Sequence, residues 1–152
     1  MRLKPIRLVV TLALVILTAP LAAEAQPATK VYRLGLLNPS SASALESRIE
    51  AFRQGLHEIG YVEGQNLIIE YRYAEGSQER LADLAAELVR LKVDVIVAPG
   101  AAAISAAQHA TRTIPIVMTA SADPVGQGFI ASLAHPGGNI TGLSFLSAEI
   151  PG

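Results

Sequence analysis

Cysteine and tryptophan are both missing from this chain of 152 residues, and charge is scarce, with 12 basic and 13 acidic residues. Without cysteine the chain has no disulfide, no thiolate metal site and no attachment point for a lipid anchor. Setting aside residues 1–25 leaves nine basic and twelve acidic residues, a net charge of −3. Because nucleic-acid binding requires a basic surface, we expect no nucleic-acid partner.

The first 25 residues have the layout of a secretory signal peptide. A basic start is followed by an apolar run over residues 8–17, and residues 23–25 (Ala-Glu-Ala) form a small-x-small cleavage site. The run of ten residues is too short to span a bilayer as a helix. We therefore expect residues 1–25 to be removed, leaving a periplasmic or secreted protein that begins at Gln26; an uncleaved membrane anchor is the alternative.

Apolar patterns divide residues 26–152 into alternating strands and helices. Five short apolar runs predict strands over residues 31–37, 67–73, 93–98, 114–119 and 140–145. Helical spacing predicts helices over residues 45–59 and 78–91. An alanine-rich segment predicts a small helix over residues 101–110, and a short helix is expected over residues 125–134, after Asp123 and Pro124 as N-cap and first helical residue. The first helix is expected to begin with a capping box of Ser43 and Glu46. Half-polar alternation in residues 67–73 indicates an edge strand.

This alternation indicates an α/β fold with a doubly wound, parallel, five-stranded sheet. Strand–helix–strand units at this spacing form right-handed crossovers, which make neighbouring strands parallel. About 127 residues are enough for one domain with one core. In open sheets of this kind, ligands bind beyond the carboxyl ends of the strands.

Three loops at those strand ends carry the candidate ligand contacts. Amide, hydroxyl and carboxyl groups follow the first and fourth strands, and a helix that begins at Gly100 has side chains too small to cover its first N–H groups. Those N–H groups and the helix dipole favour a carboxylate. The candidate contacts are Asn38, Ser40, Ser41, Gly100, Ala101, Ala102, Ser121 and Asp123. The alternatives are that the two serines are ordinary turn residues and that Asp123 caps the following helix.

Other chemistry has little support in the sequence. Residues 126–131 match G-x-G-x-x-A, but they follow the fourth strand and lack the acidic residue expected about twenty positions later. His57, His109 and His135 are scattered, with no spacing typical of a metal site. No nucleophile-elbow, phosphate-loop or paired-carboxylate motif is present. We therefore expect no cofactor, no metal and no enzymatic activity.

Several segments, taken in order, resemble a known family. They are residues 31–37 (VYRLGLL), 52–56 (FRQGL), 60–66 (GYVEGQN), 114–117 (IPIV), 122–126 (ADPVG) and 135–142 (HPGGNITG). Together they resemble ABC-transporter substrate-binding proteins of the tryptophan-binding TrpX type, over essentially all of residues 26–152.

The resemblance implies a type I periplasmic binding fold, in which two α/β lobes close on a small solute. This chain is similar to the first lobe only, with the second lobe absent. The implied function is the extracytoplasmic solute-binding component of an ABC importer, which captures a small polar solute such as an amino acid non-covalently. Its implied partner is an ABC permease in the inner membrane. A small secreted α/β enzyme and a sensor domain of the same fold stay open as alternatives.

Overall fold

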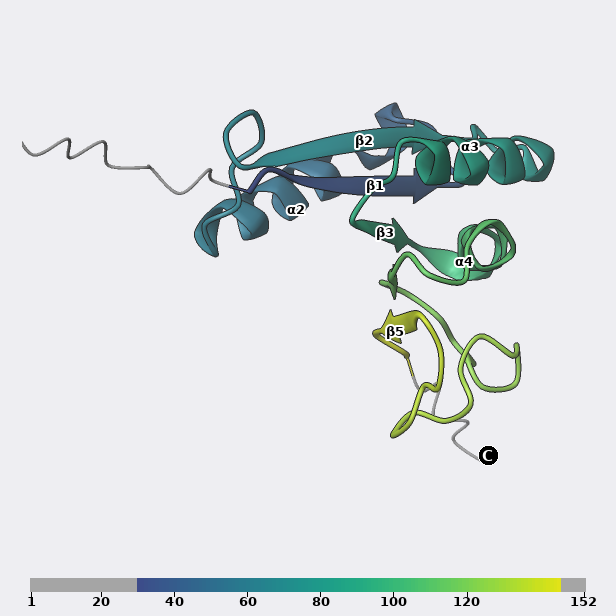
Figure 1. Cartoon of the computed structure of the whole chain (residues 1–152). Helices are drawn as coiled ribbons and strands as arrows, with labels where there is room; N and C mark the ends of the chain where they lie inside the picture. The colour runs from purple at the N-terminus through teal and green to yellow at the C-terminus, as the bar shows by residue number, and fades with distance from the viewer. Residues whose placement is uncertain (1–29, 146–152) are drawn as a thin grey trace, which may run out of the picture.

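The computed structural model describes residues 30–145 and contains one sheet of five parallel strands (Figure 1). The strands are β1 (Tyr32–Asn38), β2 (Leu67–Tyr73), β3 (Val95–Ala98), β4 (Ile116–Met118) and β5 (Ile140–Gly142). Their order across the sheet is β2-β1-β3-β4-β5, and every pair is parallel. The predicted doubly wound α/β sheet is confirmed, and β2 is an edge strand as expected.

Three α-helices and one 3₁₀ turn connect the strands. They are η1 (Ser43–Leu45), α2 (Glu46–Glu58), α3 (Gln78–Arg90) and α4 (Gly100–Ala110). The start of α3 follows from its cap, because the Ser77 side chain accepts a hydrogen bond from the N–H of Arg80. Within the described residues, no helix combines the length and the apolar character that a bilayer crossing requires.

The predicted capping box at Ser43 is wrong. Ser43 lies inside η1, and α2 has Leu45 at its N-cap position with no side-chain cap. The Ser43 hydroxyl instead lies 3.3 Å from the hydroxyl of Ser41. The 3₁₀ turn places the N-cap of α2 at Leu45, two residues after Ser43, so the serine lies too early to serve as a cap.

The predicted helix over residues 125–134 is also wrong, since the segment forms a series of turns. The N–H of Gly128 donates to the oxygen of Val125, and that of Phe129 donates to the oxygen of Pro124. Gly128 has φ of +73°, a conformation that a right-handed helix does not contain. Asp123 and Pro124 suggested the start of a helix here, but Gly128 interrupts it.

The core lies on both faces of the sheet. The α3–α4 face buries apolar residues of strands and helices: Leu37, Ile96, Ile116, Met118, Ile140, Leu81, Ala85, Leu88, Ile104 and Ala107. The α2 face buries Leu34, Leu36, Leu67, Ile69 and Val97. From α2 only half-buried side chains, among them Phe52, reach that second cluster. Most of the tightly packed core is therefore under α3 and α4.

Gly35 lets α3 lie close to the central strand. A Cβ atom at Gly35 would come 2.9 Å from both Cδ atoms of Leu88, closer than carbon atoms normally approach. Leu88 is fully buried. The absent side chain in β1 thus makes room for the leucine of α3.

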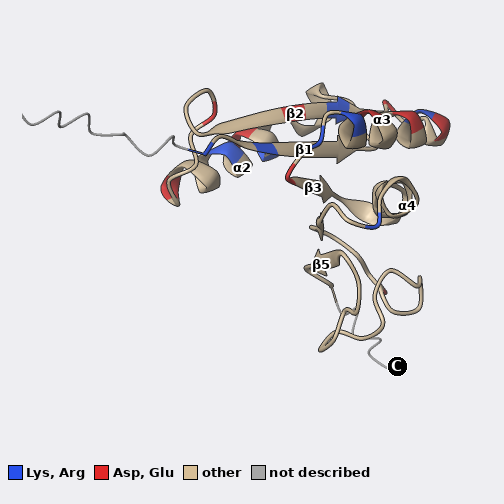
Figure 2. Cartoon of the chain, viewed as in Figure 1, with Lys and Arg blue, Asp and Glu red and all other residues tan. Residues whose placement is uncertain are grey.

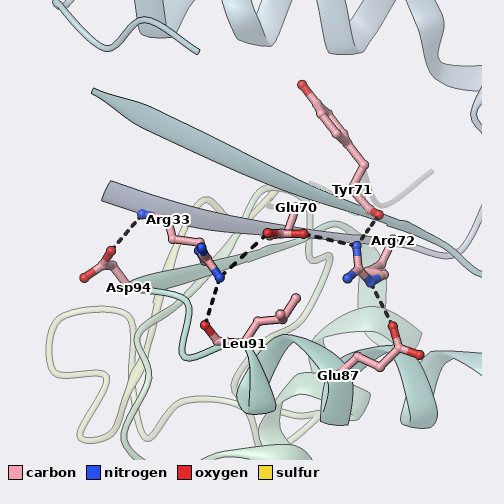
Figure 3. A network of polar contacts seen from close by, with 7 residues as sticks. All are labelled: Arg33, Glu70, Tyr71, Arg72, Glu87, Leu91 and Asp94. Carbon is pink, nitrogen blue, oxygen red and sulfur yellow. Dashed lines mark hydrogen bonds and ion pairs between the residues drawn. The ribbon is translucent and has the colours of Figure 1, made fainter. Parts of the chain in front are cut away.

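Ion pairs join β1, β2 and α3 on the same face (Figure 3). Glu70 lies between two guanidinium groups, 3.9 Å from Arg33 and 3.5 Å from Arg72. Arg72 also pairs with Glu87 of α3 at 2.9 Å. Because these side chains are partly exposed, each pair contributes little alone, about 1 kcal/mol or less. The network mainly orients α3 over the edge of the sheet.

We expect Leu88→Ala to lower the free energy of unfolding by about 2–5 kcal/mol, because it removes a fully buried side chain and leaves a cavity. Leu133→Ala is the matched control, since that leucine is 55% exposed and should change the value by less than about 0.5 kcal/mol. Urea denaturation followed by circular dichroism measures both. Equal losses for the two variants would contradict the packing described for α3.

Candidate functional site

Parallel strands place their carboxyl ends at one edge of the sheet, where hydrogen bonds join the following loops in two pairs, β1 with β2 and β3 with β4. The N–H of Ala74 donates to the oxygen of Asn38 at 2.9 Å, and that of Gly76 donates to the oxygen of Pro39 at 2.7 Å. The N–H of Gly100 donates to the oxygen of Ala120 at 3.0 Å. The loops after β1, β3 and β4, which were predicted to carry the site, therefore lie at a common edge.

Asn38 fixes the loop after β1. Its side chain is buried, 6% exposed, and its Oδ1 accepts a hydrogen bond from the N–H of Ser40 at 3.0 Å. This contact is an Asx turn, which shapes the backbone without help from a ligand. The hydroxyl of Ser41 lies within hydrogen-bonding distance of the hydroxyl of Ser43. The turn interpretation of the two serines thus has direct structural support, while their hydroxyls still lie at the carboxyl edge.

The start of α4 differs from the expectation in one respect. Gly100 has φ of +76°, and its N–H is already bonded to Ala120, so it offers no free donor. Pro99 is the N-cap residue and provides no side-chain cap. The N–H groups of Ala101 and Ala102 belong to the first helical turn, whose donors have no partner within the helix. A carboxylate bound at the start of α4 would therefore have to accept hydrogen bonds from the N–H groups of these two alanines.

Ser121 and Asp123 follow β4 and have different surroundings. Ser121 is buried, 4% exposed, and its hydroxyl lies 3.5 Å from the Oε1 of Gln127. Asp123 is exposed, and its Oδ1 accepts a hydrogen bond from the N–H of Gly126 at 2.8 Å. The aspartate therefore caps a turn, while the helix that it was predicted to cap does not form. The sequence analysis did not identify Gln127. Its contact with Ser121 is formed by turns in a segment that was predicted to be a helix.

A groove of about 910 Å³ lies beside this edge, between α3 and α4. The residues that line its end near the strand ends are Gln78, Ala101, Ala102 and Gln127. The other predicted contacts do not line it. The side chains of Ala101 and Ala102 thus face the space between two helices, whereas the remaining candidates lie at the strand ends.

A second hollow of about 340 Å³ lies between α2 and the start of β2. Charges there neutralise one another: Arg53 pairs with Glu63 at 2.9 Å, and the Tyr71 hydroxyl donates to Glu63 at 3.3 Å. Burial chiefly, and then the Glu63 carboxylate, raises the pKa of Tyr71 to about 12. Burial also raises the pKa of Tyr73. Because Arg53 pairs with both Glu50 and Glu63, this hollow is a poorer candidate for a charged ligand.

One of the three histidines, His109, lines the groove between α3 and α4 together with Ala101 and Ala102. His109 Nδ1 lies 2.7 Å from the backbone oxygen of Ser105 on α4. His57 lines the second hollow beside α2, and His135 lies in the turns before β5. In the part of the chain that the structure describes, no group of three or more potential metal ligands comes together.

Comparisons with known proteins point to one family. A family model described as ABC transporter substrate binding protein matches residues 34–150. The curated "Tyrosine-binding protein" of Clostridioides difficile is 34% identical over 121 residues, covering 79% of this chain and 35% of that protein.

Solved structures agree with this match. A ligand-free, open substrate-binding protein with adhesive properties from Clostridium difficile has a TM-score of 0.72 and 31% identity, covering 78% of this chain and 41% of the other. A Streptococcus pneumoniae protein in complex with L-Trp has a TM-score of 0.69 and 30% identity, covering 76% and 39%. This chain therefore spans only about two fifths of the length of these relatives.

We expect Asp123→Ala to lower the free energy of unfolding by about 0.5–2 kcal/mol, because it removes the side-chain acceptor for the N–H of Gly126. Asp123→Asn keeps an oxygen at the same place and should retain most of the stability. Urea denaturation of the two variants measures the difference. If both lose the same amount, the charge of Asp123 rather than its cap contact stabilises the turn.

Proposed function

The chain belongs to the family of ABC transporter substrate-binding proteins, and on that premise we propose that it is the extracytoplasmic solute-binding component of an ABC importer. It binds a small polar solute, such as an amino acid, without covalent chemistry. The match over residues 34–150 is the observation that carries this proposal. Proteins of this family are extracytoplasmic binding proteins rather than enzymes. The tyrosine-binding relative and the relative in complex with L-Trp support an amino acid as the solute.

The proposed mechanism assigns one side of the solute to this lobe. The loops after β1, β3 and β4 hold the solute, and a second lobe of the kind implied by the resemblance closes over it. Closure buries the solute and shifts a two-state hinge equilibrium. An ABC permease in the inner membrane then recognises the closed form. The shared edge at which these loops meet supports this assignment.

The solute's carboxylate is proposed to meet backbone N–H groups rather than a cationic side chain. Arg80, in the first turn of α3, is already paired with Glu75 at 3.4 Å. The N–H groups of Ala101 and Ala102 are donors without an intrahelical partner, and the dipole of α4 favours a negative charge there. The amide of Asn38 and the hydroxyls of Ser40, Ser41 and Ser121 supply neutral polar contacts around that charge.

The enzyme alternative lacks a partnered nucleophile at this edge. Ser121 is the buried hydroxyl there, and its contact is the amide of Gln127 rather than an imidazole. An activated serine requires a neighbouring general base. The geometry therefore favours binding. A sensor domain would share this site and differ in its membrane partner, so co-purification with a permease or with a kinase separates those two functions.

Processing of the leader is a direct test of the proposed location. Residues 1–25 lie outside the described residues, and we propose that they are a signal peptide cleaved before Gln26. N-terminal sequencing or intact mass of protein recovered from the periplasm should show Gln26 as the first residue. Uncleaved chain in the membrane fraction would contradict both the cleavage site and the proposed location.

We expect Ala101→Leu or Ala102→Leu to weaken solute binding by about 1–3 kcal/mol, because a bulky side chain obstructs the first N–H groups of α4. Titration calorimetry with tyrosine and tryptophan, on a protein that carries both lobes, measures the loss. Ala51→Leu, the same change at an exposed position of α2, is the control and should bind normally.

Asp123→Asn should weaken binding less than the Ala101 and Ala102 variants, since asparagine retains the cap of the turn. The opposite order is informative. If Asp123→Asn abolishes binding while both leucine variants bind normally, the site recognises a cationic amine through Asp123. That result would reject carboxylate binding by the first N–H groups of α4, while the proposed solute-binding function would stand.

A further inference from the structure

An aromatic ring lies beside the candidate contacts at the carboxyl edge. Tyr73 is the last residue of β2 and is in register with Asn38, the last residue of β1. The N–H of Ala74, which follows it, donates to the oxygen of Asn38 at 2.9 Å. Tyr73 follows Tyr71 by two positions, so both side chains lie on the face of the sheet that α2 covers. Tyr73 is half-buried, so part of its surface stays accessible.

Tyr71 supports the ring of Tyr73 in a defined orientation. The two rings are parallel to within 6°, with their centroids 6.3 Å apart, a separation at which aromatic side chains attract one another. The hydroxyl of Tyr71 donates to Glu63 at 3.3 Å, and Glu63 in turn pairs with Arg53 at 2.9 Å. Figure 3 shows Tyr71 on the side of β2 opposite Arg72. The ring of Tyr73 is therefore oriented before a solute arrives, which reduces the entropy lost on binding.

The strand order places Tyr73 within reach of the start of α4. In the order β2-β1-β3, the ends of β2 and β3 are two strand spacings apart, about 10 Å. Tyr73 lies on the α2 face, whereas α4 covers the other face. A solute whose carboxylate accepts hydrogen bonds from the N–H groups of Ala101 and Ala102 therefore lies across the ends of β3 and β1 when its side chain reaches Tyr73. This span favours a solute with a long side chain.

We propose that Tyr73 determines which amino acids bind, by packing its ring against the aromatic side chain of the solute. This inference rests on the proposed function, since it requires an amino-acid solute whose carboxylate is bound at α4. Two aromatic rings attract one another more strongly than the burial of their area alone accounts for, and an aliphatic side chain lacks that additional attraction. Tyr73 therefore favours aromatic amino acids over aliphatic ones such as leucine.

Two other aromatic residues near this edge lack the same combination of access and support. Phe145 is exposed, and its N–H donates to the oxygen of Ser121 at 2.9 Å. In the described chain, however, its ring pairs with no other aromatic ring. Phe129, in the turns after β4, is buried and borders the groove between α3 and α4. Tyr73 alone of the three is both partly accessible and supported by a neighbouring ring.

Solute selectivity tests the assignment. In a protein that carries both lobes, we expect Tyr73→Leu to weaken tryptophan binding about three- to tenfold and to change leucine binding by less than about twofold. Tyr73→Phe keeps the ring and should bind tryptophan as the unaltered protein does. Tyr32→Leu, the same change at the amino end of β1, is the matched control and should bind both amino acids normally. Titration calorimetry measures the affinities, and circular dichroism checks that each variant is folded.

The outcomes separate this inference from the proposed function. If the unaltered protein binds neither amino acid, the proposed amino-acid binding is contradicted, and the inference with it. If Tyr73→Leu leaves tryptophan binding unchanged, or weakens tryptophan and leucine equally, the inference is overturned and the solute-binding function stands. A loss of tryptophan affinity in Phe145→Leu but not in Tyr73→Leu would assign the aromatic contact to Phe145 instead.

Discussion

The fold depends on the burial of β1 between two neighbouring strands and two helical layers. β1 pairs along its whole length with β2 and through Leu34–Leu36 with β3. Alternate residues of β1 then serve different layers: Leu34 and Leu36 belong to the cluster under α2, and Leu37 belongs to the one under α3 and α4. Because the strand has no exposed face in its second half, its register fixes where its last residue, Asn38, enters the carboxyl edge.

The sequence predicted those parts of the fold that depend on local pattern. Continuous apolar runs identified the strands, half-polar alternation identified the edge strand β2, and helical spacing over residues 78–91 identified α3. The sequence did not predict the turns around Gly128, because Asp123 and Pro124 suggested the start of a helix and only the positive φ shows the interruption. It likewise did not predict η1, in which Ser43 contacts a neighbouring hydroxyl instead of capping α2.

The candidate site was predictable in place but less so in detail. Parallel topology determines which loops share an edge, so Asn38 and Asp123 were placed correctly at strand ends. Whether a given N–H is free depends on contacts between distant segments, such as the bond from Gly100 to Ala120, which no local pattern shows. The contact between Ser121 and Gln127 has the same origin. The topology predicted from the sequence thus indicates which loops can form a site. Which hydrogen-bond donors are free in those loops is seen only in the structure.

Charge is distributed unevenly between the two halves of the lobe (Figure 2). Between Val95 and Phe145 the acidic and basic residues are Arg112 and Asp123 alone. In the other half, β2, α2 and α3 carry most of the ion pairs. At the ends of β3 and β4 an incoming charge therefore meets mainly backbone dipoles and neutral groups. Fixed dipoles need no mobile side chain to be ordered on binding, so less conformational entropy would be lost if the proposed solute docked there.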